Sequence, residues 1–146
     1  MGVLSGKRGL IMGVANERSI AWGIAKACAE AGAELAFTYQ GEAFGQRLAP
    51  LAASVGSDFM VDVDVTNDAS LDAAFAALGA RWDKLDFVVH AIAFSDKNEL
   101  TGRFLNTSRA NFKNSLDISC YSLVEVTRRA HPLMVENGGT VLTLTY

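Results

Sequence analysis

Short apolar runs alternate with segments of helical periodicity along the whole chain. The runs that predict strands cover residues 8–13, 33–39, 58–63, 85–90 and 139–146. The segments that predict helices cover residues 19–31, 41–54, 70–78 and 111–131. Such alternation is typical of repeated β-α-β units, whose strands lie parallel in one sheet with helices on both faces. The pattern therefore predicts a doubly wound α/β fold.

Particular residues mark the ends of the predicted helices. We expect Ser19 to cap the first helix at its start and Gly32 to close it. The third helix is expected to start at Ala69 or Ser70, and Pro132 to help end the long fourth helix. The face of that helix predicted to pack on the sheet carries Phe112, Leu116, Cys120, Leu123, Val124 and Thr127.

The loop between the first strand and the first helix predicts a dinucleotide site. Gly13 ends the apolar run at a place where a side chain would block a diphosphate. The first helical turn, after Ser19, would direct free N–H groups and the positive end of the helix dipole at the anion. The next glycine is Gly23, already inside the helix, so the common G-x-G-x-x-G fingerprint is absent. We interpret the opening as a Rossmann-type unit with an unusual loop.

Residues that follow the other strands are expected to face the same crevice, since the carboxyl ends of parallel strands meet at one edge. Gln40 follows the second strand, where an acidic side chain commonly binds the adenosine ribose. It is neutral, and a 2′-phosphate would lack a strong partner unless Arg47 folds back, which favours NADH over NADPH. The predicted cofactor-binding residues are Gly13, Val14, Ala15, Ser19, Ile20, Gln40, Asp64, Val65 and Ile92.

These residues also have structural alternatives, which stay open at this point. Asp64, Val65 and Thr66 fit an ordinary Asx turn, and Gln40 fits a solvated loop. We expect His90 to be a hydrogen-bonded residue at a strand end rather than a catalytic base. The dinucleotide interpretation is favoured by order, because four strand ends each supply a residue type suited to a successive part of one ligand.

Composition narrows the function classes. The 146 residues are 50% hydrophobic and 20% charged, with a mean hydropathy of +0.19, as expected for one globular domain. A net charge of −3 gives no basic stripe for nucleic acid, and the apolar runs are too short for a membrane span. With no apolar leader, a cytoplasmic location is expected. Cys28 and Cys120 are expected to be buried free thiols, and two histidines are too few for a metal cluster.

Two segments do not fit a complete sheet with ordinary connections. The polar segment 95–110 is too long for a simple loop and predicts a functional loop or an extra short element. The last strand, 139–146, has no helix after it, which would leave a sheet edge unpaired and a face uncovered. We therefore expect residues 1–146 to be the N-terminal, incomplete part of a single dinucleotide-binding domain, or to be completed by a partner segment.

Five motifs together carry a resemblance to a known family. They are Gly13-Val-Ala-Asn-Glu-Arg-Ser19-Ile-Ala-Trp-Gly23, Phe37-Thr-Tyr-Gln40, Asp62-Val-Asp64-Val65, His90-Ala-Ile-Ala-Phe94 and Leu142-Thr-Leu-Thr-Tyr146. The combination resembles the bacterial NADH-dependent enoyl-acyl-carrier-protein reductases of type II fatty acid synthesis. These enzymes are a divergent branch of the short-chain dehydrogenase/reductase superfamily.

The resemblance implies an activity and roles for particular residues. NADH would reduce the trans-2 double bond of an enoyl group on acyl carrier protein, and a phenol hydroxyl would stabilise the enolate. Tyr146 would be the first of two active-site tyrosines, with the second tyrosine and a lysine beyond it. The substrate-binding loop would include Phe94, Ser95 and Leu100. A cytoplasmic homotetramer is also implied. The alternatives are a relative that acts on a carbonyl or alcohol, and a non-catalytic dinucleotide-binding module.

Overall fold

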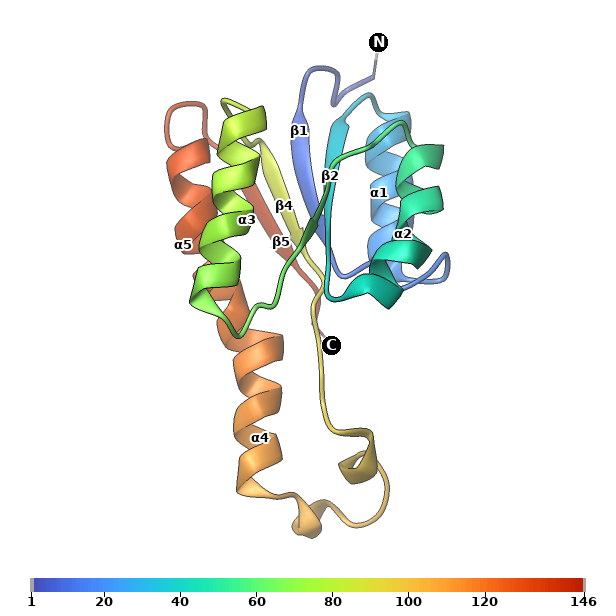
Figure 1. The fold of residues 1–146 in the computed structure, drawn as a ribbon, viewed down its shortest axis with the longest axis vertical. Coiled ribbons are helices and arrows are strands. Elements are labelled where there is room, and N and C mark those ends of the chain that lie inside the picture. Colours follow the sequence, from blue (N-terminus) through green and yellow to red (C-terminus); the bar gives the residue numbers. More distant parts are fainter. Residues whose placement is uncertain (1, 146) are drawn as a thin grey trace.

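The computed structural model describes residues 2–145, which form one sheet flanked by helices (Figure 1). All strands are parallel, in the order β3-β2-β1-β4-β5. The predicted doubly wound α/β fold is thereby confirmed. The predicted runs extend past the hydrogen-bonded strands, most of all in the third and the fifth, because apolar positions continue into the connections. The strands are β1 (Arg8–Met12), β2 (Glu34–Tyr39), β3 (Met60–Asp62), β4 (Phe87–His90) and β5 (Thr140–Thr143).

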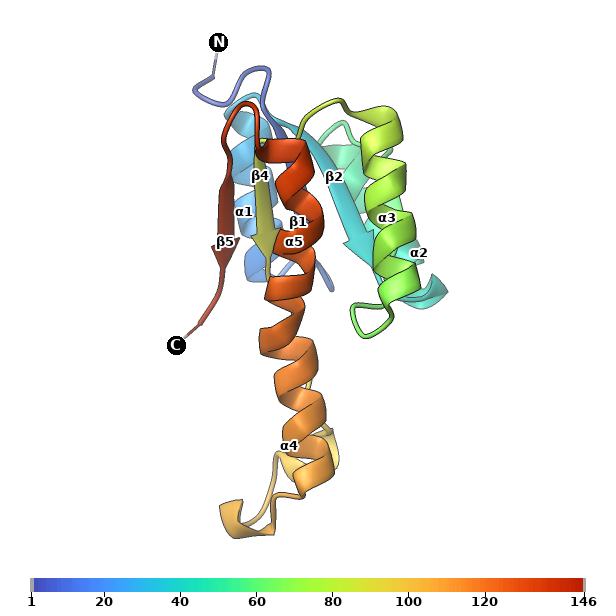
Figure 2. The same cartoon turned by 90° about the vertical axis from the view of Figure 1, so that its left-hand side faces the viewer.

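The helices lie in two layers. Helices α1 and α2 cover one face of the sheet, and α3 and α5 cover the other (Figures 1 and 2). The long segment 95–110 holds two short 3-10 helices, η1 and η2, as the prediction of an extra element anticipated. The bounds are α1 (Ile20–Glu30), α2 (Glu42–Ser54), α3 (Asp68–Arg81), η1 (Lys97–Glu99), η2 (Phe104–Asn106), α4 (Arg109–Leu116), the π-helix η3 (Asp117–Tyr121) and α5 (Ser122–Met134).

Alternating side chains of the central strands divide the core into two parts. In β1, Leu10 and Met12 pack toward α3 and α5, whereas Ile11 packs toward α1 and α2. Trp22 of α1 and Phe37 of β2 fill the second part, with ring centroids 6.4 Å apart. The central runs are continuously apolar because their strands are buried on both faces.

The strand β5 lies at the edge of the described sheet. Its Leu142 remains 44% exposed. The prediction of an uncovered final strand is therefore confirmed for the described residues. Within residues 2–145, none of the helices has the length and apolar character that a bilayer-spanning segment needs.

The helix-end predictions are partly wrong. Asn67, not Ala69 or Ser70, caps α3: its Oδ1 accepts a hydrogen bond from the Ser70 N–H at 3.1 Å, so the helix starts at Asp68. Pro132 lies inside α5, which continues to Met134. The first helix does end as predicted, since Gly32 follows the C-cap residue with φ +98°.

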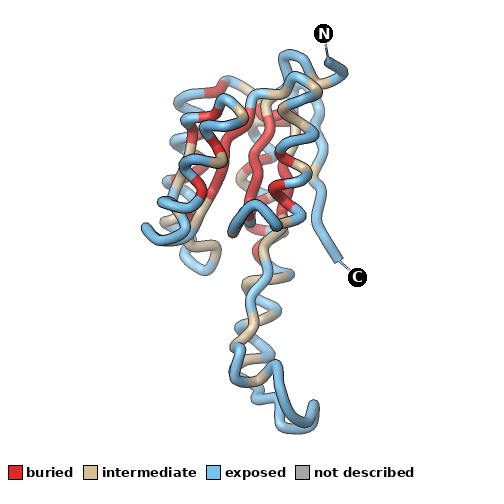
Figure 3. Tube along the Cα trace, turned by 90° about the vertical axis from the view of Figure 1, so that its right-hand side faces the viewer, coloured by how far each residue is buried: buried red, intermediate tan, exposed pale blue. Residues whose placement is uncertain are grey.

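The predicted core face of the long helix is wrong. Elements α4, η3 and α5 form one continuous helix whose first half projects beyond the sheet (Figures 1 and 3). That half has no layer to pack against. The π-helical turn in η3 also shifts which residues lie on the same side of the helix before and after it. Phe112, Leu116, Cys120 and Val124 are exposed, and Leu123 and Thr127 are half-buried. The buried positions are Ser122, Glu125, Val126, Ala130 and Met134.

The expectation of two buried thiols is correspondingly wrong for Cys120. This residue lies in η3 on the projecting helix and is exposed. Cys28 of α1 is half-buried against the second core part, and burial raises the pKa of its thiol. Both cysteines are free, as predicted.

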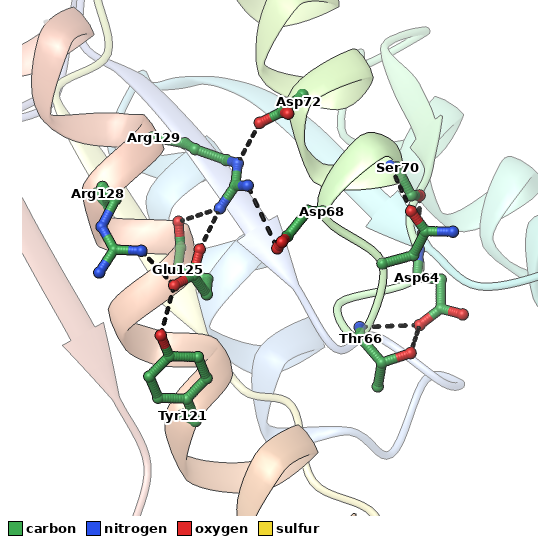
Figure 4. A network of polar contacts seen from close by, with 10 residues as sticks. Asp64, Thr66, Asp68, Ser70, Asp72, Tyr121, Glu125, Arg128 and Arg129 are labelled. Carbon is green, nitrogen blue, oxygen red and sulfur yellow. Dashed lines mark hydrogen bonds and ion pairs between the residues drawn. The ribbon is translucent and has the colours of Figure 1, made fainter.

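A buried carboxylate holds the arginine that links α5 to α3 (Figure 4). The Glu125 side chain accepts hydrogen bonds from Tyr121 Oη at 2.8 Å and from Arg129 Nη1 at 2.5 Å, and it also pairs with Arg128. Arg129 reaches across to α3, where its Nε lies 2.6 Å from Asp72 Oδ1. The hydrogen bond from Tyr121, followed by those from the two arginines, lowers the pKa of Glu125 from 4.5 to about 2.

The depressed pKa of Glu125 predicts a pH-dependent contribution to stability. The contribution is complete above about pH 4.5 and is lost as the pH falls toward about 2, since the unfolded chain takes up the proton first. We expect Glu125→Gln to destabilise the whole protein clearly at about pH 6 and much less at about pH 3. Urea midpoints at both pH values measure this. Glu30→Gln, at the exposed end of α1, is the control and should show a smaller difference at both.

Candidate functional site

A pocket of about 480 Å³ opens at the carboxyl ends of β1, β2, β3 and β4. The ends of these strands and the connections that follow them line it, together with Phe44 of α2 and two residues of the long helix. This is the edge of a parallel sheet at which ligands bind. Of the predicted site residues, those that line the pocket are Gly13, Val14, Ala15, Gln40, Asp64, Val65, Ile92 and Phe94.

Gly13 allows β1 and β4 to approach each other closely in the pocket wall. Its φ is +103°, and a Cβ added there would lie 1.9 Å from the Ala91 carbonyl oxygen. The Ala91 N–H donates to the Met12 carbonyl oxygen at 3.0 Å, so the ends of β1 and β4 are held together at this point. Only glycine fits this backbone without strain.

Ser19 organises the loop rather than the helix. It occupies the predicted N-cap position of α1, but its Oγ accepts hydrogen bonds from the N–H groups of Ala15 and Asn16, at 3.0 and 3.1 Å. Among the described residues, the N–H groups of Ile20 and Ala21 have no hydrogen-bond partner. An anion beside this turn would therefore meet free donors and the positive end of the helix dipole. The Ile20 side chain itself is 69% exposed and does not line the pocket.

Asp64 forms the Asx-type turn that the sequence left open and also lines the pocket. Its Oδ1 accepts from the Thr66 N–H at 2.9 Å and from Thr66 Oγ1 at 2.7 Å, which is the Asx-type turn. The Asp64 N–H donates to Ser70 Oγ at 2.9 Å, which fastens the turn to α3. The residue nevertheless lines the pocket, so the turn positions its carboxylate beside any ligand there.

A carboxylate of the neighbouring strand β3 lies beside the end of β2, which the sequence did not predict. Gln40 is exposed at the rim of the pocket, and the next residue, Gly41, turns the chain with φ +81°. The Gly41 N–H donates at 3.0 Å to Oδ1 of Asp62, which ends β3. Arg47, considered above as a cation for a 2′-phosphate, lies over the ring of Phe44, 5.7 Å from its centroid.

The segment after β4 is held against the long helix by small polar side chains. Ser119 Oγ accepts from the Phe94 N–H at 3.0 Å and donates to the Phe94 carbonyl oxygen at 3.1 Å. Ser95 Oγ accepts from Asn111 Nδ2 at 3.1 Å and from Ser115 Oγ at 3.0 Å. Ser95 therefore fastens the segment instead of lining the pocket.

Leu100 and Tyr146 complete the set of predicted site residues. Leu100, the C-cap of η1, is 69% exposed and does not line the pocket. Tyr146 lies outside the described residues. Sequence reasoning missed Asn114 and Ile118, which complete the pocket from the long helix. The stripe of Asn111, Ser115 and Ser119, spaced four residues apart, was the available signal that this helix binds a neighbouring segment.

His90 is buried at the end of β4, 1% exposed, as a hydrogen-bonded residue. Ser122 Oγ donates to the Ile118 carbonyl oxygen at 2.6 Å, so it accepts from His90 Nε2–H at 2.7 Å. Burial lowers the pKa of His90, and in the neutral ring Nδ1 then accepts from Thr143 Oγ1 at 3.1 Å. His90 thus joins β4, β5 and the long helix, which confirms the structural expectation. No group of side chains within residues 2–145 is arranged to hold a metal ion.

The comparisons with known proteins agree with this geometry. A family model described as enoyl-(acyl carrier protein) reductase matches residues 13–146. An enoyl-[acyl-carrier-protein] reductase [NADH] 2 of Rhizobium meliloti is 62% identical over 145 residues, which are 99% of this chain and 54% of the relative. The chain thus spans about half the length of that relative.

Solved structures give the same result. The crystal structure of FabI from Candidatus Liberibacter asiaticus is 57% identical, with a TM-score of 0.97 over 100% of this chain and 56% of that one. An enoyl-(acyl-carrier-protein) reductase from Anaplasma phagocytophilum in complex with NAD is 52% identical, with a TM-score of 0.95 over 99% and 55% of the chains. The motif resemblance is confirmed, and the chain belongs to the enoyl-(acyl carrier protein) reductase family.

Proposed function

We propose that the protein reduces the trans-2 double bond of enoyl thioesters on acyl carrier protein, with NADH as the reductant, in fatty acid elongation. The observation that carries this proposal is the loop from Gly13 to Ser19. It combines a close backbone approach with free N–H groups at the start of α1, on the wall of a 480 Å³ pocket. A diphosphate fits these donors. The names of the relatives and the NAD complex support the choice of coenzyme and substrate.

In this proposal the pocket residues hold successive parts of the coenzyme. Gly13, Val14, Ala15, Ser19 and Ile20 bind or shape the diphosphate site. Gln40 binds the adenosine ribose, Asp64 and Val65 the adenine, and Ile92 the nicotinamide side. When bound, NADH supplies the hydride that is added to the β carbon of the substrate.

The substrate is proposed to lie beside the segment after β4. Phe94 is 50% exposed at the pocket wall, where it can contact an acyl chain. Ser95 and Leu100 act in the same loop, Ser95 by fastening it to the long helix. The Tyr146 phenol is proposed to assist in stabilising the enolate oxygen, because a neutral tyrosine donates a hydrogen bond at pH 7 without ionising.

The assembly and organisation are also proposals. We propose that residues 1–146 form the N-terminal part of one dinucleotide-binding domain, supported by the edge strand β5. We further propose a cytoplasmic homotetramer that uses neither nucleic acid nor membrane. The exposed apolar side chains of the long helix, among them Phe112 and Leu116, support an oligomer, and the net charge of −3 argues against a nucleic-acid partner.

The test is NADH oxidation by the whole protein with a crotonyl thioester of acyl carrier protein or pantetheine. We expect a loss of NADH absorbance that depends on the thioester and on the protein. A ketone and an alcohol panel serve as comparison substrates, because turnover of these alone would indicate a different short-chain dehydrogenase/reductase activity. Coenzyme binding without any turnover would instead indicate a non-catalytic binding module.

A further inference from the structure

A carboxylate lies at the ribose end of the proposed coenzyme site, although it belongs to a different strand from the one expected to supply it. Dinucleotide-binding sheets commonly place an acidic residue at the end of the second strand, where it binds the ribose 2′-hydroxyl. Here that place is taken by the neutral Gln40. Asp62, at the end of the neighbouring strand β3, is paired in register with Tyr39. Its carboxylate reaches across to the β2 side and accepts the Gly41 N–H at 3.0 Å.

Charges around this point are mostly negative. Asp62 ends β3, Asp64 follows two residues later, and Glu42 begins α2 directly after Gly41. Arg47 of α2 has its guanidinium over the Phe44 ring. A phosphate monoester carries a charge of about −1.5 to −2 at pH 7. The carboxylates would oppose its approach.

We propose that Asp62 is a specificity-determining residue that selects NADH over NADPH. The inference rests on the proposed function, because it assumes that the adenosine ribose lies beside Gln40 at the pocket rim, next to Gly41 in the chain. The Asp62 carboxylate acts in two ways. It occupies the Gly41 N–H, a donor that a 2′-phosphate would otherwise use, and its charge repels that phosphate. The same carboxylate can accept a hydrogen bond from the 2′-hydroxyl of NADH.

The experiment uses Asp62→Asn in the whole protein. Asparagine has nearly the same shape, and its Oδ1 can still accept the Gly41 N–H, so the variant removes the charge and keeps the turn. Dissociation constants for NADH and NADPH are measured by fluorescence titration. We expect NADPH to bind about tenfold more tightly to the variant, with NADH binding changed less than about threefold. The preference of the unaltered protein should also fall with added salt more than that of the variant.

Glu30→Gln is the matched control, because it removes the same charge at the far end of α1, and it should leave both constants unchanged. An unchanged NADPH-to-NADH ratio in Asp62→Asn overturns the inference, as does an equal loss of both coenzymes. A preference for NADPH in the unaltered protein also overturns it but leaves the proposed reductase activity intact. Failure of the unaltered protein to bind either coenzyme contradicts the proposed function itself.

Discussion

Replacing Gly13 with alanine is expected to weaken NADH binding at least about tenfold and to destabilise the protein by about 2–4 kcal/mol. The reason is geometric. Residue 13 has φ +103°, outside the conformations that L side chains adopt, and the new Cβ would overlap the Ala91 carbonyl group at 1.9 Å. Because Ala91 is hydrogen-bonded to Met12, the clash can be relieved only by moving the ends of β1 and β4 apart. That movement displaces two walls of the pocket together.

The matched control is Gly23→Ala. Gly23 is exposed within α1, and nothing lies within 4 Å of a Cβ added there. Alanine should stabilise this helix by about 0.5–1 kcal/mol and leave NADH binding unchanged. Fluorescence titration and urea unfolding of the whole protein measure both effects. If Gly13→Ala binds NADH as tightly as the unaltered protein, the close approach of β1 to β4 has no part in coenzyme binding.

His90→Ala is expected to destabilise the protein by about 2–4 kcal/mol. The substitution empties a buried site and leaves the hydroxyl of Ser122, itself 1% exposed, without the donor it accepts from. The three elements that His90 joins would lose their shared hydrogen bonds. Since His90 directly precedes the segment 91–94, coenzyme affinity should fall as well.

Urea unfolding measures the stability effect, with His131→Ala as the control. His131 is the other histidine of the chain and is exposed on α5, so its loss should change stability by less than about 0.5 kcal/mol. Nitrogen NMR of the unaltered protein should show a neutral ring with the proton on Nε2. A ring charged at neutral pH, or equal effects of the two substitutions, would contradict the hydrogen-bond assignment.

The strands, and the pocket residues that follow them, were predictable from sequence for a simple reason. Buried parallel strands such as β1 and β2 are continuous apolar runs, and the residues after them must meet at one edge. Gly13, Gln40, Asp64 and Ile92 do line one pocket, although they are far apart in sequence. Local chain order and the rules of parallel sheets are sufficient for this conclusion.

The long helix shows where local periodicity fails. Leu116 and Val124 lie at helical spacing in the sequence, yet both are exposed, because the sheet ends before the helix does and a π-helical turn lies between them. How far a helix projects past its sheet is a tertiary property. The pocket contributions of Asn114 and Ile118 depend on the same property.

Asp62 illustrates a second limit. As a sequence position it is one of several acids at a strand end, and nothing local distinguishes it from Asp64. Its importance comes from the register of β3 beside β2, which brings its carboxylate to the Gly41 N–H. Interactions between neighbouring strands that are distant in sequence are not encoded in any short window.

The measurement that tests the central claim most directly is a crystal structure of the whole protein grown with saturating NADH. We expect diphosphate oxygens within hydrogen-bond distance of the N–H groups of Ile20 or Ala21, with the adenosine ribose beside Gln40. Density for the coenzyme at another surface, with the Gly13 pocket filled only by solvent, would contradict the account.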